Sequence, residues 1–302
     1  MHDEHTFDFH VHTHLSDADV DQSPEAICAA AKQAGLHALS ITDHDHLLPD
    51  EQRRALAQQY DLELVPGCEI SCVWAPPDSN RRAIVHLGAH WLCSQDDGLR
   101  QVVEHNSAQP FDRYTMQMVH NFKKLGLDPT LGRGEEYAYD RLCDLHPQTR
   151  HRGKRDVAHY LESVGCVPDR QTAYQMLAYG GPAYVDPLSV LNFVSFEDAM
   201  RAITPHALCT LNHLFYSHLD ELSNHALLRD FVRLGGQALE VLYPRYDAQQ
   251  QGILTDFCLQ YGLLANCGSD RHDRTRPFLP GPGWMYRRLR RRQEELHGTL
   301  NL

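Results

Sequence analysis

The chain lacks several features, and each absence excludes a class of protein. No stretch approaches 18 consecutive apolar residues, which excludes a helix that spans a membrane. Residues 1–5 are polar and acidic and lack the basic and apolar regions of a secretory signal. The nine cysteines form no CxxC pair, and their odd number indicates reduced thiols and not a disulfide framework. We therefore expect a cytoplasmic protein with no membrane partner.

Positive charge is also scarce. The 28 Lys and Arg residues are outnumbered by 40 Asp and Glu residues, and the formal net charge is −12. This excess of negative charge argues against electrostatic binding of long duplex nucleic acid. A basic run, Arg287–Arg292, is followed directly by Gln293–Glu295, and this pattern is typical of a solvated helix.

Histidine is the abundant residue type. The chain has 21 histidines, many of them beside Asp or another His. A chain rich in His and Asp without paired Cys points to metal ions bound by nitrogen and oxygen ligands. With 302 residues and 42% hydrophobic content, the chain can bury a full core, as one large domain or one domain with an insertion.

Strand and helix patterns alternate in the first and last thirds of the chain. The predicted strands are 7–11, 38–41, 62–66, 69–73, 83–89, 207–211, 238–243 and 263–267. The predicted helices are one capped by Ser23 and ended by Gly35, then 50–60, 196–203, 227–234 and 248–261. Repeated strand–helix units predict an α/β fold with a parallel sheet, open or closed into a barrel.

The middle of the chain has a different pattern. It is helical and polar with few strand-like runs, and the predicted helices are 98–107, 112–125, 155–164 and 169–178. We interpret residues 98–188 as a helical insertion or cap. Residues 1–97 and 189–302 then form the α/β domain.

Candidate metal ligands lie at the ends of the first two predicted strands, 7–11 and 38–41. His10 and His12 project from one face of a strand end, because alternate residues of a strand point the same way. Asp17 can return from the following loop. Asp43 and His44 come after the second strand, where an acid beside a His can bind metal or fix its tautomer. Polar residues at a strand end and a capped turn are the structural alternatives.

Further candidates follow the later strands. Glu69 lies in an apolar segment, where burial is costly unless the carboxylate is paired, although a sheet edge would also explain it. His86 lies in an apolar run and is either a ligand or a core histidine. His213, Asp270 and His272 each follow a strand. Active sites of β/α folds form at the carboxyl ends of strands, so this shared register indicates a site for two or three metal ions.

These motifs, in this order, resemble those of the PHP family, the polymerase and histidinol phosphatase superfamily of metal-dependent phosphoesterases. The matching segments are Asp8–Thr13, Ser16–Asp17, Ile41–Asp45, Pro66–Ser71, Val85–Gly88, His213 and Gly268–His272. The resemblance implies a distorted (β/α)7 barrel of the TIM-like kind with a trinuclear metal site. It is closest to the stand-alone nucleotide phosphatase and 5′–3′ exoribonuclease branch, which carries a helical insertion in the same place. The implied ligands are His10, His12, Asp17, His44, Glu69, His86, His213, Asp270 and His272.

Two segments depart from the family pattern. Where the family has AHPxR, this chain reads Asn212–Tyr216, so the arginine that can meet phosphate is absent. In the insertion, Lys154 stands where the branch has a phosphate-binding arginine, and Asp156 replaces a histidine. The arginines that can compensate are Arg150, Arg152 and Arg155.

The resemblance implies hydrolysis of a phosphomonoester on a nucleotide or short oligonucleotide by a metal-activated water. We expect two or three divalent ions of Mn, Fe or Zn and a small phosphorylated substrate. Lys154 and Arg155 are expected to bind the phosphate. The expected catalytic residues are Asp43, His44 and His213, with Asp43 or His213 passing a proton to the leaving alkoxide.

Three other functions are open at this point. A histidinol-phosphate-type phosphatase shares the chemistry, but that branch is usually more compact. A non-catalytic metal-binding regulatory module predicts lost ligands, whereas all nine residue types are present. A metal-dependent amidohydrolase shares the barrel and the HxH start but usually carries a bridging lysine and a lone late aspartate, so Glu69 and Gly268–His272 favour a phosphoesterase.

Overall fold

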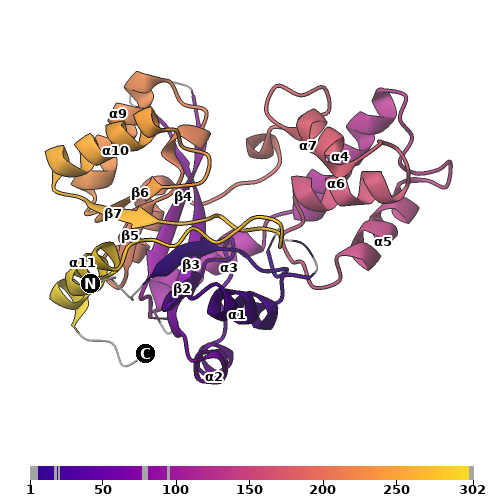
Figure 1. Ribbon diagram of the computed structural model, residues 1–302. Helices are drawn as coiled ribbons and strands as arrows, with labels where there is room; N and C mark the ends of the chain where they lie inside the picture. Colours follow the sequence, from indigo (N-terminus) through magenta and orange to yellow (C-terminus); the bar gives the residue numbers. More distant parts are fainter. Residues whose placement is uncertain (1–5, 17–18, 20, 77–80, 94–95, 299–302) are drawn as a thin grey trace.

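The computed structural model describes residues 6–16, 19, 21–76, 81–93 and 96–298. Figure 1 shows a central sheet flanked by helices and, to its right, a separate lobe of helices. No helix within these residues combines the length and the apolar content needed to cross a membrane.

Seven strands form one sheet in the order in which they occur along the chain. They are β1 (Phe7–Val11), β2 (Ala38–Ile41), β3 (Glu63–Trp74), β4 (Ala83–His90), β5 (Leu208–Leu211), β6 (Ala238–Leu242) and β7 (Leu264–Cys267). Neighbours pair in parallel except at β4, which is antiparallel to both β3 and β5. The connection from Trp74 to Ala83 is too short for the crossover helix that a parallel strand needs, so the chain turns straight back.

The first and last strands meet and nearly close the sheet into a barrel. The His12 amide donates to the Arg271 carbonyl at 2.9 Å, and the Asp270 amide donates to the His10 carbonyl at 2.7 Å. Val11 and Arg271 also form a parallel bridge. The predicted α/β class and distorted seven-stranded barrel are confirmed, although the sheet is mixed and not wholly parallel.

Strand β3 joins two segments, 62–66 and 69–73, that the sequence pattern predicts as separate. Gly67 lies between them, and a Cβ atom there would come within 2.0 Å of Ser40 Oγ. Strands β2 and β3 can approach this closely because residue 67 has no side chain. The strand therefore continues through the glycine and carries Glu69 into the barrel, where it is fully buried.

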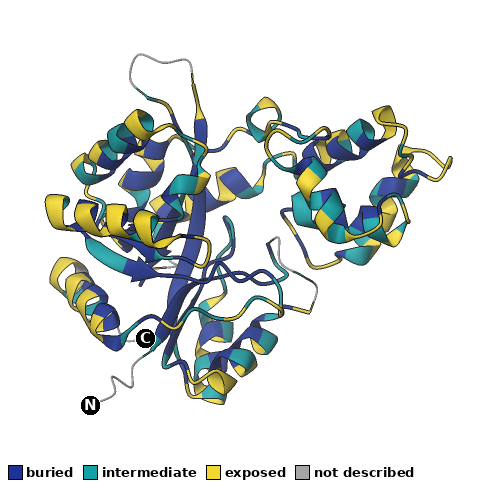
Figure 2. Ribbon diagram, turned by 45° about the horizontal axis from the view of Figure 1, so that its top comes forward, coloured by how far each residue is buried: buried dark blue, intermediate teal, exposed yellow. Residues whose placement is uncertain are grey.

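The helices lie mostly on the outside of the sheet. They are α1 (Pro24–Gln33), α2 (Asp50–Tyr60), α3 (Asp97–Ser107), α4 (Phe111–Lys124), α5 (Glu135–Leu145), α6 (Lys154–Ser163), α7 (Arg170–Leu177), α8 (Phe196–Ile203), α9 (Glu221–Arg233), α10 (Ala248–Tyr261) and α11 (Gly283–His297), with short 3₁₀ turns η1 (Pro187–Ser189) and η2 (Leu214–Tyr216). The helices around the sheet turn their buried faces toward it and their exposed faces outward, whereas α4 to α7 bury their apolar faces against one another (Figure 2). Ser23 caps α1 as predicted, since its side chain accepts a hydrogen bond from the Ala26 amide.

Helix α11 covers the end of the barrel where most strands begin. Its Met285, Tyr286 and Leu289 pack in one cluster with Phe7 and Phe9 of β1 and with the first residues of β2, β5 and β6. This end of the barrel is thus filled with apolar side chains. Any site that needs polar groups must lie at the opposite end.

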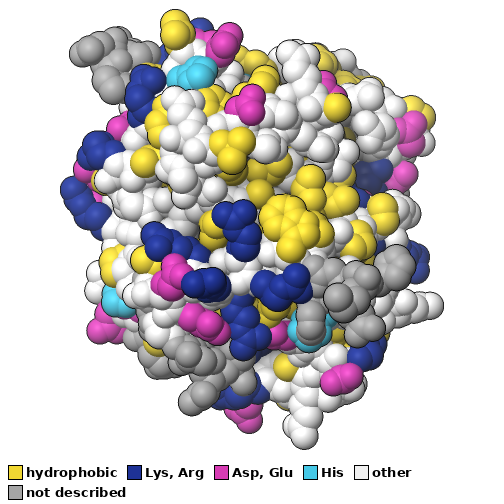
Figure 3. Space-filling model, turned by 60° about the vertical axis from the view of Figure 1, so that its left-hand side comes forward, with side chains coloured by type: hydrophobic (Ala, Val, Ile, Leu, Met, Phe, Trp, Pro, Cys, Tyr) yellow, Lys and Arg dark blue, Asp and Glu magenta, His cyan; other side chains and the backbone are white. Residues whose placement is uncertain are grey.

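The outer face of α11 is solvated, as the arginine run predicts. Arg290 and Arg291 form ion pairs with Glu294 and Glu295, one helical turn further along. On the face of the molecule that carries α10 and α11, Lys and Arg side chains lie among acidic and apolar ones (Figure 3). Such mixing is unlike the continuous basic surface of a duplex-binding protein.

Helices α4 to α7 form the separate lobe of Figure 1 and have a hydrophobic core of their own. Helix α3 packs on the barrel instead, since Leu99, Val102 and Val103 belong to the cluster around strands β3 to β6. The division into a barrel of residues 1–97 and 189–302 and an insertion of residues 98–188 stays a prediction. From this packing, we propose that the insertion begins after α3.

Replacing Leu289 with alanine should lower the free energy of unfolding by about 2–5 kcal/mol, because the deleted side chain is fully buried under the barrel. Leu222 on α9 is 82% exposed, and Leu222→Ala should change that free energy by less than about 0.5 kcal/mol. Denaturant unfolding of both variants checks this prediction. Equal effects would mean that α11 does not stabilise the barrel.

Candidate metal centre

Eight of the nine predicted ligands converge inside the barrel, at the carboxyl ends of its parallel strands. Four overlapping groups of three account for all eight, and the ligand atoms within each group lie within 4.8 Å of one another. Asp17, the ninth predicted ligand, lies outside the described residues. The eight residues are His10, His12, His44, Glu69, His86, His213, Asp270 and His272.

The strands position these side chains at the same end of the barrel. His10 and Glu69 lie on β1 and β3, and His44 follows β2. His86 lies on β4, which runs the opposite way, yet it reaches the same end because it pairs with Ser71 near the end of β3. Glu69 is therefore not at a sheet edge, and His86 is not an isolated core histidine.

The carboxylate of Glu69 lies at the middle of the cluster. Its Oε2 atom is 3.1 Å from His10 Nε2, 3.3 Å from His12 Nε2 and 3.2 Å from His44 Nδ1. This buried oxygen has no hydrogen-bond partner in the described part of the chain. In the neutral His10 ring, Nδ1 is the donor, to Glu240 at 2.7 Å, so Nε2 turns a lone pair toward the Glu69 oxygen. A divalent cation between these atoms satisfies them all, so the residues fit a metal ion.

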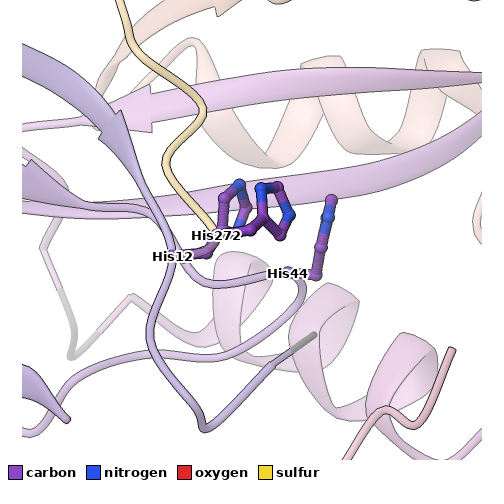
Figure 4. Close-up of side chains that lie close together, drawn as sticks. All are labelled: His12, His44 and His272. Carbon is purple, nitrogen blue, oxygen red and sulfur yellow. The ribbon is translucent and has the colours of Figure 1, made fainter. Parts of the chain in front are cut away.

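Three imidazoles from separate parts of the chain form another of the four groups (Figure 4). His12 follows β1, His44 follows β2 and His272 follows β7. The centre of the His12 ring lies 4.2 Å from that of His272 and 4.6 Å from that of His44. Protonated rings would repel each other at such distances, whereas neutral rings can share a cation. The group therefore offers nitrogen ligands to a metal ion next to Glu69.

The electrostatics of the cluster match the needs of a metal. Burial opposes ionisation of Glu69, but the surrounding imidazoles, His10 first, lower its pKa well below the usual range. Burial lowers the pKa of His86 to about 3, so this ring is neutral. Burial also opposes protonation of His10, but Glu69 and Glu240 raise its pKa well above the usual value. A proton on His10 thus compensates Glu69 until a metal displaces it.

Glu240 on β6 supports two of the ligands, and sequence reasoning missed it. Its Oε1 atom lies 2.7 Å from His10 Nδ1, and its Oε2 atom accepts the His213 amide at 2.8 Å. A carboxylate behind a ligand imidazole fixes the tautomer and orientation of the ring. The signal was present in the sequence, because Glu240 interrupts an apolar strand in the same way as Glu69.

Two more residues hold the carboxylate ligands. Asn212 Nδ2 donates to Glu69 Oε1 at 2.8 Å, and the Tyr243 hydroxyl donates to Asp270 Oδ2 at 2.9 Å. Each bond occupies one carboxylate oxygen and leaves the other turned toward the imidazoles. Nothing in the local sequence predicts these pairs, because their members lie 143 and 27 residues apart in the chain.

The backbone around the cluster adopts uncommon conformations. His213 has φ of 24° and Asp270 has φ of 50°, in the left-handed region that side chains other than glycine rarely occupy. Gly268 lies against β1 so closely that a Cβ atom would come within 2.2 Å of His10 Cβ and 2.5 Å of Glu240 Oε1. Strain and close approach of this kind persist where the surrounding structure imposes them, which is common at functional sites.

The carboxylate of Asp43 is engaged within the loops. It accepts hydrogen bonds from the Thr13 amide and hydroxyl, each at 2.7 Å, and from the Ser16 hydroxyl at 2.8 Å. These bonds tie the loop after β1 to the end of β2. Asp43 therefore holds the segment that carries His12 close to the segment that carries His44.

The insertion touches the loops that carry the ligands. Thr149 Oγ1 donates to the His14 carbonyl at 2.9 Å, and His151 Nδ1 donates to the His44 carbonyl at 2.8 Å. The Arg150 amide donates to the carbonyl of residue 15 at 3.3 Å. The segment before α6 is thereby fixed beside the metal cluster.

Lys154 and Arg155, the predicted phosphate-binding residues, open helix α6. Lys154 Nζ lies 5.3 Å from the centre of the Tyr184 ring, and the Arg155 guanidinium lies 5.4 Å from that of Tyr174. Asp156 accepts the Gly153 amide at 2.7 Å and so caps the helix. Both cations are therefore held at the start of the helix by aromatic neighbours, within the lobe.

The family model of the PHP domain matches residues 8–164 of the chain. This span is more than half of the chain and runs from β1 through α6.

Three curated relatives resemble the chain over most of its length. A phosphoribosyl 1,2-cyclic phosphate 1,2-diphosphodiesterase of Eggerthella lenta is 23% identical over 88% of this chain and 93% of the relative. A 3′,5′-nucleoside bisphosphate phosphatase of Chromobacterium violaceum is 24% identical over 91% of this chain and 88% of the relative. A 5′–3′ exoribonuclease of Haemophilus influenzae is 22% identical over 88% of this chain and 89% of the relative.

A solved structure, described as an amidohydrolase from Chromobacterium violaceum with bound sulfate and no metal, superposes with a TM-score of 0.78. It is 22% identical, and the superposition covers 95% of this chain and 96% of that one. This likeness shows that the two chains share a fold.

Replacing Glu240 with glutamine should weaken metal binding about 10–100-fold, the usual effect of losing a carboxylate behind a ligand histidine. The two Glu240 oxygens face N–H groups of His10 and His213, and a glutamine has only one acceptor oxygen for them. Metal content after dialysis against graded chelator measures the effect. Glu63→Gln is the control, because Glu63 meets Tyr286 and Arg290 at the other end of the barrel. Full metal content in Glu240→Gln would refute the role of Glu240.

Proposed function

The chain belongs to the PHP domain family, and on this premise we propose that it is a metal-dependent phosphoesterase. Its reaction would be hydrolysis of a phosphomonoester of a nucleotide or short oligonucleotide. The observation that carries the proposal is the buried Glu69 oxygen, which has no hydrogen-bond partner in the described residues and faces three imidazole nitrogens. The phosphatase and exoribonuclease among its relatives, which by name act on nucleotides or RNA, support the substrate class.

We propose two or three divalent ions at the cluster. Mn, Fe or Zn suits a donor set of imidazole nitrogens and carboxylate oxygens. When bound, such ions polarise phosphoryl oxygens and make a coordinated water acidic enough to supply hydroxide near neutral pH. The four groups of ligands share His10, His12, His44 and Glu69 between them, so the ion positions are adjacent.

The residues around the cluster would then act on the substrate and its protons. The His213 side chain is 14% exposed and its Nε2 lies 3.1 Å from Glu69 Oε1, so it borders the cluster and is partly open to solvent. We assign it the transfer of a proton to the leaving alkoxide, a role that His213 would fill in place of binding a metal. His44 acts as a ligand, and Asp43, whose oxygens already accept three hydrogen bonds, acts by positioning.

Metal-free protein reloaded with manganese should release phosphate from at least one phosphorylated nucleotide. The panel holds a 5′-mononucleotide, a 3′,5′-bisphosphate nucleotide, a 5′-phosphorylated dinucleotide, a phosphoribosyl 1,2-cyclic phosphate and histidinol phosphate. His12→Ala is the inactive control, because the His12 ring belongs to two of the ligand groups. The preferred substrate identifies the branch, and preference for histidinol phosphate would overturn the nucleotide assignment. Bound metal without turnover of any compound would favour a regulatory metal-binding module.

We propose that Lys154 and Arg155 bind the substrate phosphate where the insertion contacts the loops of the barrel. Removing either cation should raise KM about 10-fold or more, because hydrogen bonds to charged groups contribute about 1.5–3 kcal/mol each. Steady-state kinetics of Lys154→Ala and Arg155→Ala on the preferred substrate measure this. Lys124→Ala, at an exposed position in the same lobe, is the matched control. Unchanged KM in both test variants would show that these cations serve only the lobe.

A further inference from the structure

An arginine outside every predicted motif lies against a metal ligand. Arg276 is in the loop after β7, and its Nη1 atom donates to Asp270 Oδ2 at 3.1 Å and to the Asp270 carbonyl. The Arg276 side chain is 16% exposed, and that of Asp270 is 11% exposed. Both side chains are therefore mostly buried and partly open to solvent.

The loop holds Arg276 in this place through its backbone. The Asp273 carboxylate accepts the amides of Thr275 at 2.9 Å and of Arg276 at 3.0 Å. The Arg276 carbonyl accepts a hydrogen bond from the buried Arg271, whose guanidinium stacks 4.7 Å from the ring centre of Phe278. Both backbone groups of Arg276 are thus tied, and its position does not depend on its contact with Asp270 alone.

The two oxygens of Asp270 have different surroundings. Oδ2 accepts from Tyr243 at 2.9 Å and from Arg276 at 3.1 Å. Oδ1 faces the imidazoles, at 3.4 Å from His12 Nε2 and 3.2 Å from His272 Nδ1. Asp270 therefore offers a single oxygen to the cluster, and Arg276 approaches from the other side.

The free edge of the guanidinium matches a phosphoryl group. Nη1 is used by Asp270, while Nε and Nη2, which share one edge of the planar fork, make no hydrogen bond with the described residues. Such an edge can donate two parallel hydrogen bonds to two oxygens of a phosphate.

We propose that Arg276 binds the phosphoryl group of the substrate through Nε and Nη2 while Nη1 stays on Asp270. This inference rests on the proposed function and makes it more specific. The positive charge of Arg276, added to that of the metals, favours a phosphomonoester dianion over a phosphodiester monoanion. The chain then has a phosphate-binding arginine although Asn212–Tyr216 contains none.

The test measures binding of inorganic phosphate to manganese-loaded protein by calorimetry, together with metal content and kinetics. Arg276→Gln should keep its metal, weaken phosphate binding about 10–100-fold and lower kcat/KM for monoesters more than for diesters. Arg276→Lys should fall between the two, because an ammonium cannot form the paired bonds. Arg274→Gln is the matched control, since Arg274 lies in the same loop and pairs with Asp21 at an exposed position.

Different results separate the inference from the function on which it rests. Tyr243→Phe removes the other bond to Asp270 Oδ2 and should lower metal content without changing phosphate affinity per bound metal. If Arg276→Gln instead behaves like Tyr243→Phe, Arg276 only positions Asp270 and the inference is wrong. If Arg276→Lys binds phosphate as the wild type does, the paired hydrogen bonds from Nε and Nη2 are not formed and the inference is also wrong. Wild-type protein that binds phosphate through Arg276 but hydrolyses nothing would contradict the proposed function alone. Wild-type protein that binds no phosphate would contradict both.

Discussion

The ionised carboxylate of Glu69 constrains everything around it. It is fully buried, and burial of an unpaired charge costs several kcal/mol. Imidazoles supply the compensation, as protonated rings when metal is absent and as co-ligands of a cation when it is bound. The barrel must therefore bring imidazoles from separate strands to within about 3 Å of one carboxylate. The reversed direction of β4, the close approach of Gly268 to β1 and the left-handed backbone at His213 and Asp270 all serve that convergence.

The same constraint explains the residues behind the ligands. An imidazole or carboxylate that can rotate loses the geometry that a metal requires, and three of the proposed ligands here have a partner on their far side. Glu240 fixes His10, Asn212 fixes one oxygen of Glu69, and Tyr243 fixes one oxygen of Asp270. These partners come from strands β5 and β6 or from the residues that follow them, whereas the ligands that they hold lie on β1 and β3 and after β7. Barrel closure and metal binding are therefore coupled.

Local patterns predict most of the strands and helices and the converging side chains proposed as ligands. The patterns for 38–41, 50–60, 196–203 and 248–261 agree with β2, α2, α8 and α10, because caps, turns and periodicity act within a few residues. Helix α5 is missed because it buries only Ala138 and Leu142, which leaves too weak an apolar face to notice. Strand β3 is divided in two because Gly67 has the pattern of a break, although the close contact with Ser40 requires it. Glu240 could have been noticed as a carboxylate in an apolar strand, but its partners could not, because His10 lies 230 residues away. Tyr243 and Arg276 become visible only in the folded structure, where both meet Asp270.

Charge explains why a protein of net charge −12 can accept a phosphate. The eight converging ligands include six imidazoles and only two carboxylates, Glu69 and Asp270. Neutral imidazoles leave the charge of a metal uncancelled, so two divalent cations would carry four positive charges against these two negative ones. Glu240 adds a negative charge behind His10, and Arg276 adds a positive charge beside Asp270, so that these two offset each other. With two such ions bound, the described side chains would leave the centre positive inside an acidic molecule. Such a local field would attract a small anion, whereas the net charge of −12 disfavours a long polyanion.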